Sequence, residues 1–191
     1  MTIYDRIADD YDTYRSEIGA RDVLLLVQAM GVGLAVLDLG CGTGYPIAMR
    51  VAPRVSRYLG IDRSKAMLSA FRRNVPQAEC ACLDMTAIGR LVGGWDLIFS
   101  WGAICHLPIE AQTETLIAAT RLLAPAGRLL FTVGQAPGQC KGSVGPSVDC
   151  IDHYSLGRSG YTDLLTGNGM RLLAAESREA GHFVYLFENR D

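Results

Sequence analysis

The sequence predicts an α/β protein in which a mostly parallel sheet lies between two layers of helices, a three-layer α/β/α sandwich. Short apolar runs, which suit strands buried on both faces, alternate with amphipathic segments long enough for crossover helices. The first of these runs ends in glycines at every second position, within residues 40–44. Open α/β sheets bind ligands at the carboxyl ends of their strands, so this turn is the first candidate for a functional site.

Seven predicted strands cover residues 34–39, 55–61, 79–83, 95–99, 127–133, 172–175 and 183–187. Predicted helices cover residues 4–14, 21–30, 64–74, 109–123 and 155–166, and a further helix begins near Pro46. Ser64 suits the N-cap position of its helix. Only a short turn joins the last two strands, which predicts that they pair antiparallel.

Length and composition fit one globular domain over residues 1–191. The chain is 49% hydrophobic and 20% charged, with a formal net charge of −2. Basic residues form no cluster, so a nucleic-acid partner is not expected. The amino terminus lacks a signal-peptide pattern, and no apolar stretch approaches the ~20 residues that cross a bilayer. We therefore expect a cytoplasmic protein without a membrane partner, as a monomer or a homodimer.

The chain contains six cysteines, which are expected to remain free thiols in a reducing cytoplasm. Cys80 and Cys82 are separated by one residue rather than two, and no second pair has the spacing of a zinc finger. Neither a disulfide framework nor a metal is expected. Small buried side chains are the simpler interpretation of these cysteines.

The glycine turn itself narrows the class of ligand. The pattern G-x-G-x-G at Gly40, Gly42 and Gly44 lets a ligand approach the backbone, because three Cβ atoms are missing. A dinucleotide fingerprint would need glycine where Tyr45 stands, and the G-K-[ST] of a phosphate loop is missing. Asp38 precedes the turn, where a carboxylate would repel a pyrophosphate but suits a cationic amino-acid moiety.

Two further acidic residues follow the next two strands. Asp62 can accept both hydroxyls of a ribose, and its position relative to the glycine turn makes this a strong signal. Asp84 follows the third strand, where its carboxylate can accept from an adenine amino group while Met85 and Met67 line the ring. Met67 is equally well explained as a core residue, because a methionine at helical spacing usually packs inside.

In order, the segments VLDLGCGTG, YLGIDRSKAML, CLDMT, WDLIFS and LLAPAGRLLF resemble the class I S-adenosylmethionine-dependent methyltransferases over nearly the whole chain. The resemblance implies a Rossmann-like, seven-stranded sheet of order 3-2-1-4-5-7-6 with an antiparallel last strand. It implies S-adenosylmethionine as cofactor and S-adenosylhomocysteine as product, with residues 1–30 as N-terminal lid helices. Tyr11 either approaches the methionine end of the cofactor or is an ordinary residue of an amphipathic helix. The predicted cofactor-binding residues are Tyr11, Asp38, Gly40, Cys41, Gly42, Gly44, Asp62, Arg63, Met67, Asp84, Met85, Ser100 and Trp101.

The sequence motifs identify the residues that act on the methyl acceptor less clearly than those that bind the cofactor. A sulfonium donor is already activated, so the protein supplies mainly alignment, a dry site and sometimes a base. The [ND]-P-P-[YF] run of enzymes that methylate nucleic-acid bases or protein glutamine is replaced here by SWGA at residues 100–103. His106 and His153 are the candidate catalytic residues, because imidazole takes up a proton near neutral pH. A structural role, such as a helix cap at His106, is the alternative for each.

Residues 134–158 are expected to form a substrate loop, because they hold too many glycines for a strand and are too long for a simple turn. With the two histidines, this segment resembles a group of small bacterial methyltransferases. That group has acids where Gln139 and Gly102 stand here. We expect a methyltransferase that methylates a small molecule at oxygen or nitrogen. The alternatives are a non-catalytic module that binds S-adenosylmethionine or a protein partner, and a nicotinamide-dependent oxidoreductase on the related fold.

Overall fold

The structure is a computed structural model that describes residues 2–15, 17–142, 151–178 and 183–190. The chain forms two compact units, residues 1–85 and 86–191. The prediction of a single domain over residues 1–191 stays a prediction.

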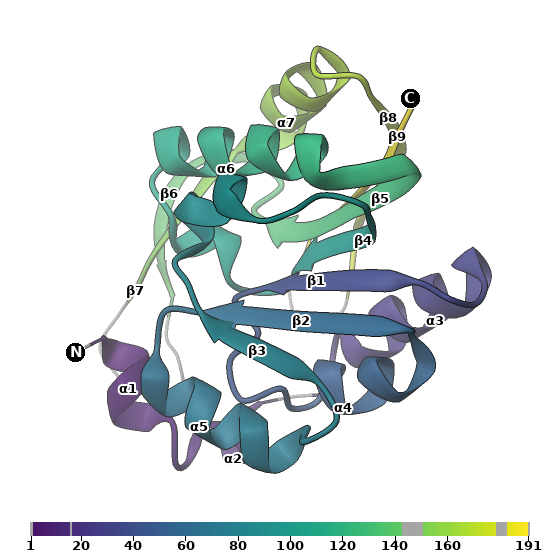
Figure 1. Cartoon of the computed structure of the whole chain (residues 1–191). Helices are drawn as coiled ribbons and strands as arrows, with labels where there is room; N and C mark the ends of the chain where they lie inside the picture. Colours follow the sequence, from purple (N-terminus) through teal and green to yellow (C-terminus); the bar gives the residue numbers. More distant parts are fainter. Residues whose placement is uncertain (1, 16, 143–150, 179–182, 191) are drawn as a thin grey trace. The chain divides into compact units, whose positions relative to one another are not determined.

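The first unit holds three parallel strands in the order β3-β2-β1 (Figure 1). They are β1 (Ala35–Leu39), β2 (Arg57–Asp62) and β3 (Glu79–Cys82). Its helices are α1 (Ile3–Ile7), α2 (Tyr11–Tyr14), α3 (Ala20–Met30), α4 (Ile47–Val51), η1 (Ala52–Arg54) and α5 (Lys65–Asn74). Leu39 lies opposite Ile61, and Asp62 lies opposite Cys82, so the carboxyl ends of the three strands meet at one edge.

The second unit holds four strands in the order β4-β5-β9-β8, of which β4 and β5 are parallel and β9 is antiparallel to both of its neighbours. They are β4 (Trp95–Ser100), β5 (Leu123–Val133), β8 (Met170–Ser177) and β9 (Phe183–Asn189). The helices are η2 (Met85–Arg90), which begins at the boundary, η3 (Ile104–His106), α6 (Ile109–Leu122) and α7 (Gly157–Thr166). Phe131 stacks on Tyr185 with ring centroids 5.3 Å apart, which fixes the core between β5 and β9.

The strand order of the chain is β3-β2-β1-β4-β5-β9-β8. This is the predicted order 3-2-1-4-5-7-6, because two additional strands precede the last pair and belong to a separate sheet. The predicted Rossmann-like α/β fold with an antiparallel last strand is confirmed. Ser64 caps α5 as predicted, since its Oγ accepts from the N–H of Met67 at 3.2 Å.

Two local predictions were wrong. The predicted helix over residues 4–14 is two short helices, and α1 begins at a capping box in which Thr2 and Asp5 satisfy each other's backbone N–H. Residues 134–158, whose glycines predict no strand, contain an antiparallel hairpin, β6 (Pro137–Gly142) and β7 (Ile151–Leu156), while their role as a substrate loop stays a prediction. Glycines cost little in β6 because most of it is exposed and packs few side chains. Residues 143–150 of that segment lie outside the described residues.

Among the helices that the structure describes, none combines the length and the apolar character needed to cross a bilayer.

Candidate functional site

The glycine turn is clamped to the neighbouring strand by its backbone. The N–H groups of Gly40 and Cys41 both donate to the carbonyl oxygen of Ile61, at 2.8 and 3.0 Å. The N–H of Gly44 then returns to the carbonyl of Cys41 at 3.0 Å. The turn therefore leaves β1 in a fixed path across the end of β2, where the acidic side chain of Asp62 stands.

Asp62 organises the loop with both carboxylate oxygens. Its Oδ2 accepts from the N–H of Gly42 at 3.0 Å, and its Oδ1 accepts from the N–H of Ser64 at 2.8 Å. Burial raises the pKa of Asp62, while the bonds from the N–H groups of Ser64 and Gly42 lower it. Each carboxylate oxygen keeps one lone-pair direction for a further donor, so two hydroxyl groups can be accepted side by side.

Asp38 is almost entirely buried, with 4% of its surface exposed. Its Oδ2 accepts from the hydroxyl of Tyr58 at 2.7 Å. Burial raises the pKa of Asp38 to about 7; the Tyr58 bond lowers it, the nearby Asp62 raises it and the charge of Arg15 lowers it. A cation placed beside this carboxylate would favour its ionised form, which is the complement that the sequence predicts.

We expect Asp38→Asn to remove a pH dependence of stability. The pKa of Asp38 is higher in the folded than in the unfolded protein. Below the unfolded pKa of 3.8 its carboxyl group is protonated in both states, so it does not lower the free energy of unfolding. Stability is lost as pH rises from there to about 7 and stays low above it. The free energy of unfolding of the variant should therefore exceed that of the wild type near pH 8, by up to about 4 kcal/mol, and match it near pH 4. Urea unfolding of both proteins across this range measures the difference, and parallel profiles would contradict it.

The N-terminal helices are fastened to this loop by carboxylates. The hydroxyl of Ser64 donates to Asp5 Oδ1 at 2.5 Å, and with Thr2 this bond lowers the pKa of Asp5 to about 2. The carboxylate of Asp12 accepts from the hydroxyl of Thr43 and, at 2.9 Å, from the side-chain amide of Asn74. These bonds join α1 and α2 to the glycine turn and to both ends of α5.

Tyr11 also lies against the turn. A Cβ built on Gly42 would lie 3.8 Å from Cε1 of Tyr11, an ordinary van der Waals contact. Tyr11 makes an edge-on contact with Tyr4, at 6.2 Å between ring centroids, and the guanidinium of Arg15 lies 5.7 Å from its ring. The structure thus brings the predicted lid tyrosine together with Gly42 in one unit.

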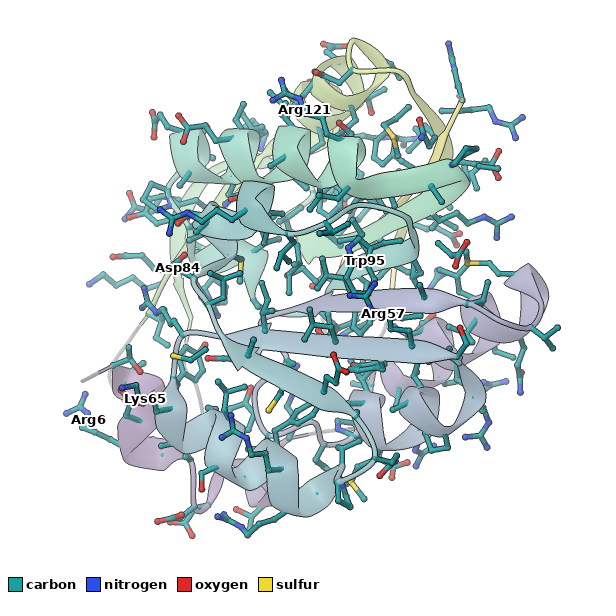
Figure 2. The ribbon with its side chains drawn as sticks, viewed as in Figure 1. Arg6, Arg57, Lys65, Asp84, Trp95 and Arg121 are labelled. Atoms are coloured by element: carbon teal, nitrogen blue, oxygen red, sulfur yellow. The ribbon has the colours of Figure 1, made fainter. Side chains whose placement is uncertain are left out.

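The other predicted cofactor-binding residues of the first unit differ in how far their side chains are exposed to solvent. Met67 is fully buried and Cys41 nearly so, and burial raises the pKa of the Cys41 thiol. Arg63 is exposed, whereas Asp84 and Met85 are half-buried. Figure 2 shows Asp84 at the carboxyl end of β3, at the edge where the glycine turn leaves β1.

The second unit holds Ser100, Trp101 and the two histidines. Ser100 and Trp101 are buried at the end of β4, and Ser100 Oγ accepts from the N–H of Ile104 at 3.1 Å. This bond begins the short helix η3 that carries His106.

His106 and His153 lie together although 47 positions separate them in the chain. Their ring centroids are 4.7 Å apart, with an angle of 61° between the planes. His153 belongs to β7, and burial lowers its pKa while the charge of Asp152 raises it. Lowering the pKa favours the neutral imidazole, which has a lone pair to offer.

The sequence prediction missed several residues of the site, namely Asp5, Asp12, Thr43, Tyr58, Asn74 and Cys105. Asp12 and Asn74 are 62 positions apart, and no spacing rule reports such a contact. Cys105 directly precedes His106, and its thiol and the two imidazoles offer donor atoms within 4.8 Å of one another. The adjacent Cys-His pair is the one signal in the sequence that points to this cluster, because thiolate and imidazole are both common metal ligands.

Known proteins resemble this chain in sequence and in fold. Residues 36–127 match a family model described as a methyltransferase domain. The chain is 36% identical over 112 residues to the trans-aconitate 2-methyltransferase of Azoarcus sp. (strain BH72). That match covers 58% of this chain and 42% of the relative, so the chain spans less than half the length of that protein.

Solved structures share the fold at low sequence identity. An S-adenosylmethionine-dependent methyltransferase from Clostridium acetobutylicum superposes with a TM-score of 0.75 at 13% identity, covering all of both chains. The amino pentose methyltransferase CalS10 from Micromonospora echinaspora, solved with bound SAM, also reaches 0.75, at 18% identity, covering 99% of this chain and 97% of that one. Residues 36–127 therefore match a methyltransferase domain in sequence, and the chain has the fold of S-adenosylmethionine-dependent methyltransferases, as the motifs predict.

Proposed function

We propose that this protein transfers the methyl group of S-adenosylmethionine to oxygen or nitrogen of a small-molecule acceptor. The observation that carries the proposal is the glycine turn held by Asp62 at the carboxyl ends of β1 and β2. It occurs within the residues that match a methyltransferase domain. The names of the relatives, a trans-aconitate methyltransferase and an amino pentose methyltransferase, support a small acceptor.

Each part of the cofactor has a proposed partner in the first unit. The two free lone-pair directions of Asp62 accept the ribose hydroxyls. Asp38 lies one strand away, opposite Gly60, where its carboxylate complements the ammonium of the methionine moiety. Asp84 accepts from the adenine amino group, and Met85 lies beside the ring. Gly40, Gly42 and Gly44 keep the backbone accessible, and Tyr11 on the anchored α2 covers the turn.

Where the acceptor atom carries a proton, the reaction needs that proton to leave. The lone pair of the acceptor oxygen or nitrogen attacks the methyl carbon, the carbon–sulfur bond breaks, and its electrons convert the sulfonium to a neutral thioether. An acceptor that reacts through an O–H or N–H group must then lose this proton, whereas a carboxylate has none to lose. We assign this step to the site of His106 and His153, because two neighbouring imidazoles offer lone pairs near neutral pH.

Calorimetry and turnover test the proposal together. We expect purified protein, freed of bound ligand, to bind S-adenosylmethionine and S-adenosylhomocysteine but not NAD(H). With a panel of small acceptors that includes trans-aconitate and amino sugars, S-adenosylhomocysteine should form. Absence of binding to both sulfur ligands would overturn the proposal. Binding without turnover on any acceptor of the panel would favour the non-catalytic module instead.

A further inference from the structure

A thiol and two imidazoles converge in the second unit. The side chains of Cys105, His106 and His153 each offer one donor atom, and these atoms all lie within 4.8 Å of one another. Cys105 is 7% exposed, and both histidines are half-buried. Sulfur and imidazole nitrogen are the donors that borderline divalent ions such as Zn²⁺ prefer.

The backbone segments that carry these donors are held together by one buried amide. The side-chain NH₂ of Gln112 donates to the carbonyl of Leu107 at 2.8 Å and to the carbonyl of Tyr154 at 3.0 Å. Leu107 follows His106, and Tyr154 follows His153. Gln112 is itself fully buried, and its Oε1 accepts from the hydroxyl of Tyr161. The donors are therefore brought together by the fold rather than by chance contact of flexible side chains.

The ring of His153 points into a restricted space. A Cβ built on Gly142, on the paired strand β6, would lie only 2.7 Å from Cε1 and 2.9 Å from Nε2 of His153. The ring thus occupies room that only glycine leaves. Its Nε2 is buried and has no hydrogen-bond partner among the residues that the structure describes. A buried polar nitrogen in that state is costly unless something binds it.

We infer that Cys105, His106 and His153 bind a divalent cation of the zinc class. Donors of a tetrahedral site lie about 3.3–3.6 Å apart, given Zn–N and Zn–S bonds of about 2.0–2.1 and 2.3 Å. Side-chain torsions that draw the three donors together by about 1 Å would satisfy this geometry. Three protein ligands leave one coordination position for water or an anionic ligand, which is the pattern of sites that bind substrate.

The ion would also add a step to the proposed function, because it would bind the acceptor. This role rests on the proposed function, whereas the metal site itself does not. A metal-bound hydroxyl group of the acceptor loses its proton to solvent more readily, because the cation lowers its pKa. With the ion bound, the imidazole lone pairs would be occupied by it, so the proton of the acceptor would pass to solvent instead of to His106 or His153.

Metal titration tests the inference without the methyl-transfer reaction. Full-length protein stripped by a chelator is titrated with Zn²⁺ alone, in competition with a chromophoric chelator, and separately with Co²⁺ alone. We expect one tight ion and, with Co²⁺, the charge-transfer absorption of a thiolate ligand. His153→Ala and Cys105→Ser should each weaken Zn²⁺ binding by about 100-fold or more, since even outer-shell changes cost about 10–100-fold.

The matched control is Cys140→Ser. Cys140 is exposed and lies opposite His153 in the β6–β7 pair, so this variant changes a neighbouring thiol that is outside the cluster. Its Zn²⁺ affinity and thiolate band should equal those of the wild type. Zn²⁺ binding that survives His153→Ala, or a thiolate band that disappears with Cys140 instead of Cys105, would overturn the inference. If the cluster variants fail to fold, a Co²⁺ spectrum of the wild type without a thiolate band overturns it. Calorimetry with S-adenosylhomocysteine on the same stripped protein reports separately on the proposed function.

Discussion

Gly44→Ala is expected to lower the free energy of unfolding by about 2–5 kcal/mol. Gly44 has a φ of +81°, a left-handed conformation that a residue with a Cβ adopts at a cost. The new Cβ would also lie 2.7 Å from Cγ2 of Val75 and 2.9 Å from Cδ2 of Phe71. Both side chains are fully buried, so neither can move aside without disturbing the core of the first unit. Urea unfolding of wild type and variant measures the loss.

Gly42→Ala is the matched control, because it changes the same turn without the steric conflict. Gly42 has a φ of +55°, and among the described residues a Cβ there would contact Cε1 of Tyr11 alone, at an ordinary distance of 3.8 Å. The free energy of unfolding of this variant should fall only by the cost of placing an alanine in the left-handed conformation, about 1–2 kcal/mol. Equal losses for the two variants would contradict the close packing of Gly44 against α5.

These two glycines sharpen what the motif means. Read from the sequence, Gly40, Gly42 and Gly44 are equivalent devices that let a ligand approach the backbone. In the structure, Gly44 is required by the packing of α5 behind the turn, whereas the Cβ position of Gly42 faces Tyr11 on the predicted lid. The spacing of the motif predicts the turn. The packing around it shows that Gly44 is needed to avoid a clash with the core, whereas Gly42 lies beside Tyr11.

The fold could be predicted because its signals are local. An apolar run that ends in a turn, such as residues 34–39, identifies a strand by itself, and Ser64 identifies a helix start by itself. Right-handed crossovers between parallel strands then restrict the strand order. The hairpin of β6 and β7 was not predicted because its strands depend on backbone hydrogen bonds to each other. Glycines such as Gly138 also lower the strand propensity of this exposed segment.

The site could be predicted only in part for a similar reason. Asp38 and Asp62 stand beside strand ends, so topology alone brings them to one edge of the sheet. The attachment of Asp12 to Thr43 depends instead on how the N-terminal helices pack. The meeting of Cys105 with His153 depends on a tertiary hydrogen bond of Gln112, which no periodicity records.

Asp62→Ala is expected to weaken binding of S-adenosylhomocysteine by roughly 1.5–3 kcal/mol, or roughly 10- to 150-fold in Kd. The variant loses a charged acceptor for the ribose hydroxyls. It also loses the anchor of the N–H groups of Gly42 and Ser64, now held at 3.0 and 2.8 Å. Asp62→Asn keeps the shape and one acceptor oxygen, so its affinity should fall between those of the wild type and the alanine variant. Calorimetry measures all three proteins, with Asp163→Ala as an exposed-acid control.

Two ligands separate the ribose contact from the loop anchor. An analogue of S-adenosylhomocysteine that lacks both ribose hydroxyls cannot donate to Asp62. The Asp62→Ala substitution should therefore weaken binding of this analogue less than binding of S-adenosylhomocysteine. The difference between the two ligands in their response to Asp62→Ala is then the coupling free energy between carboxylate and hydroxyls. A large coupling supports direct recognition of the ribose. An equal loss for both ligands would mean that Asp62 acts only by holding the glycine turn in place, and the proposed contact would be wrong.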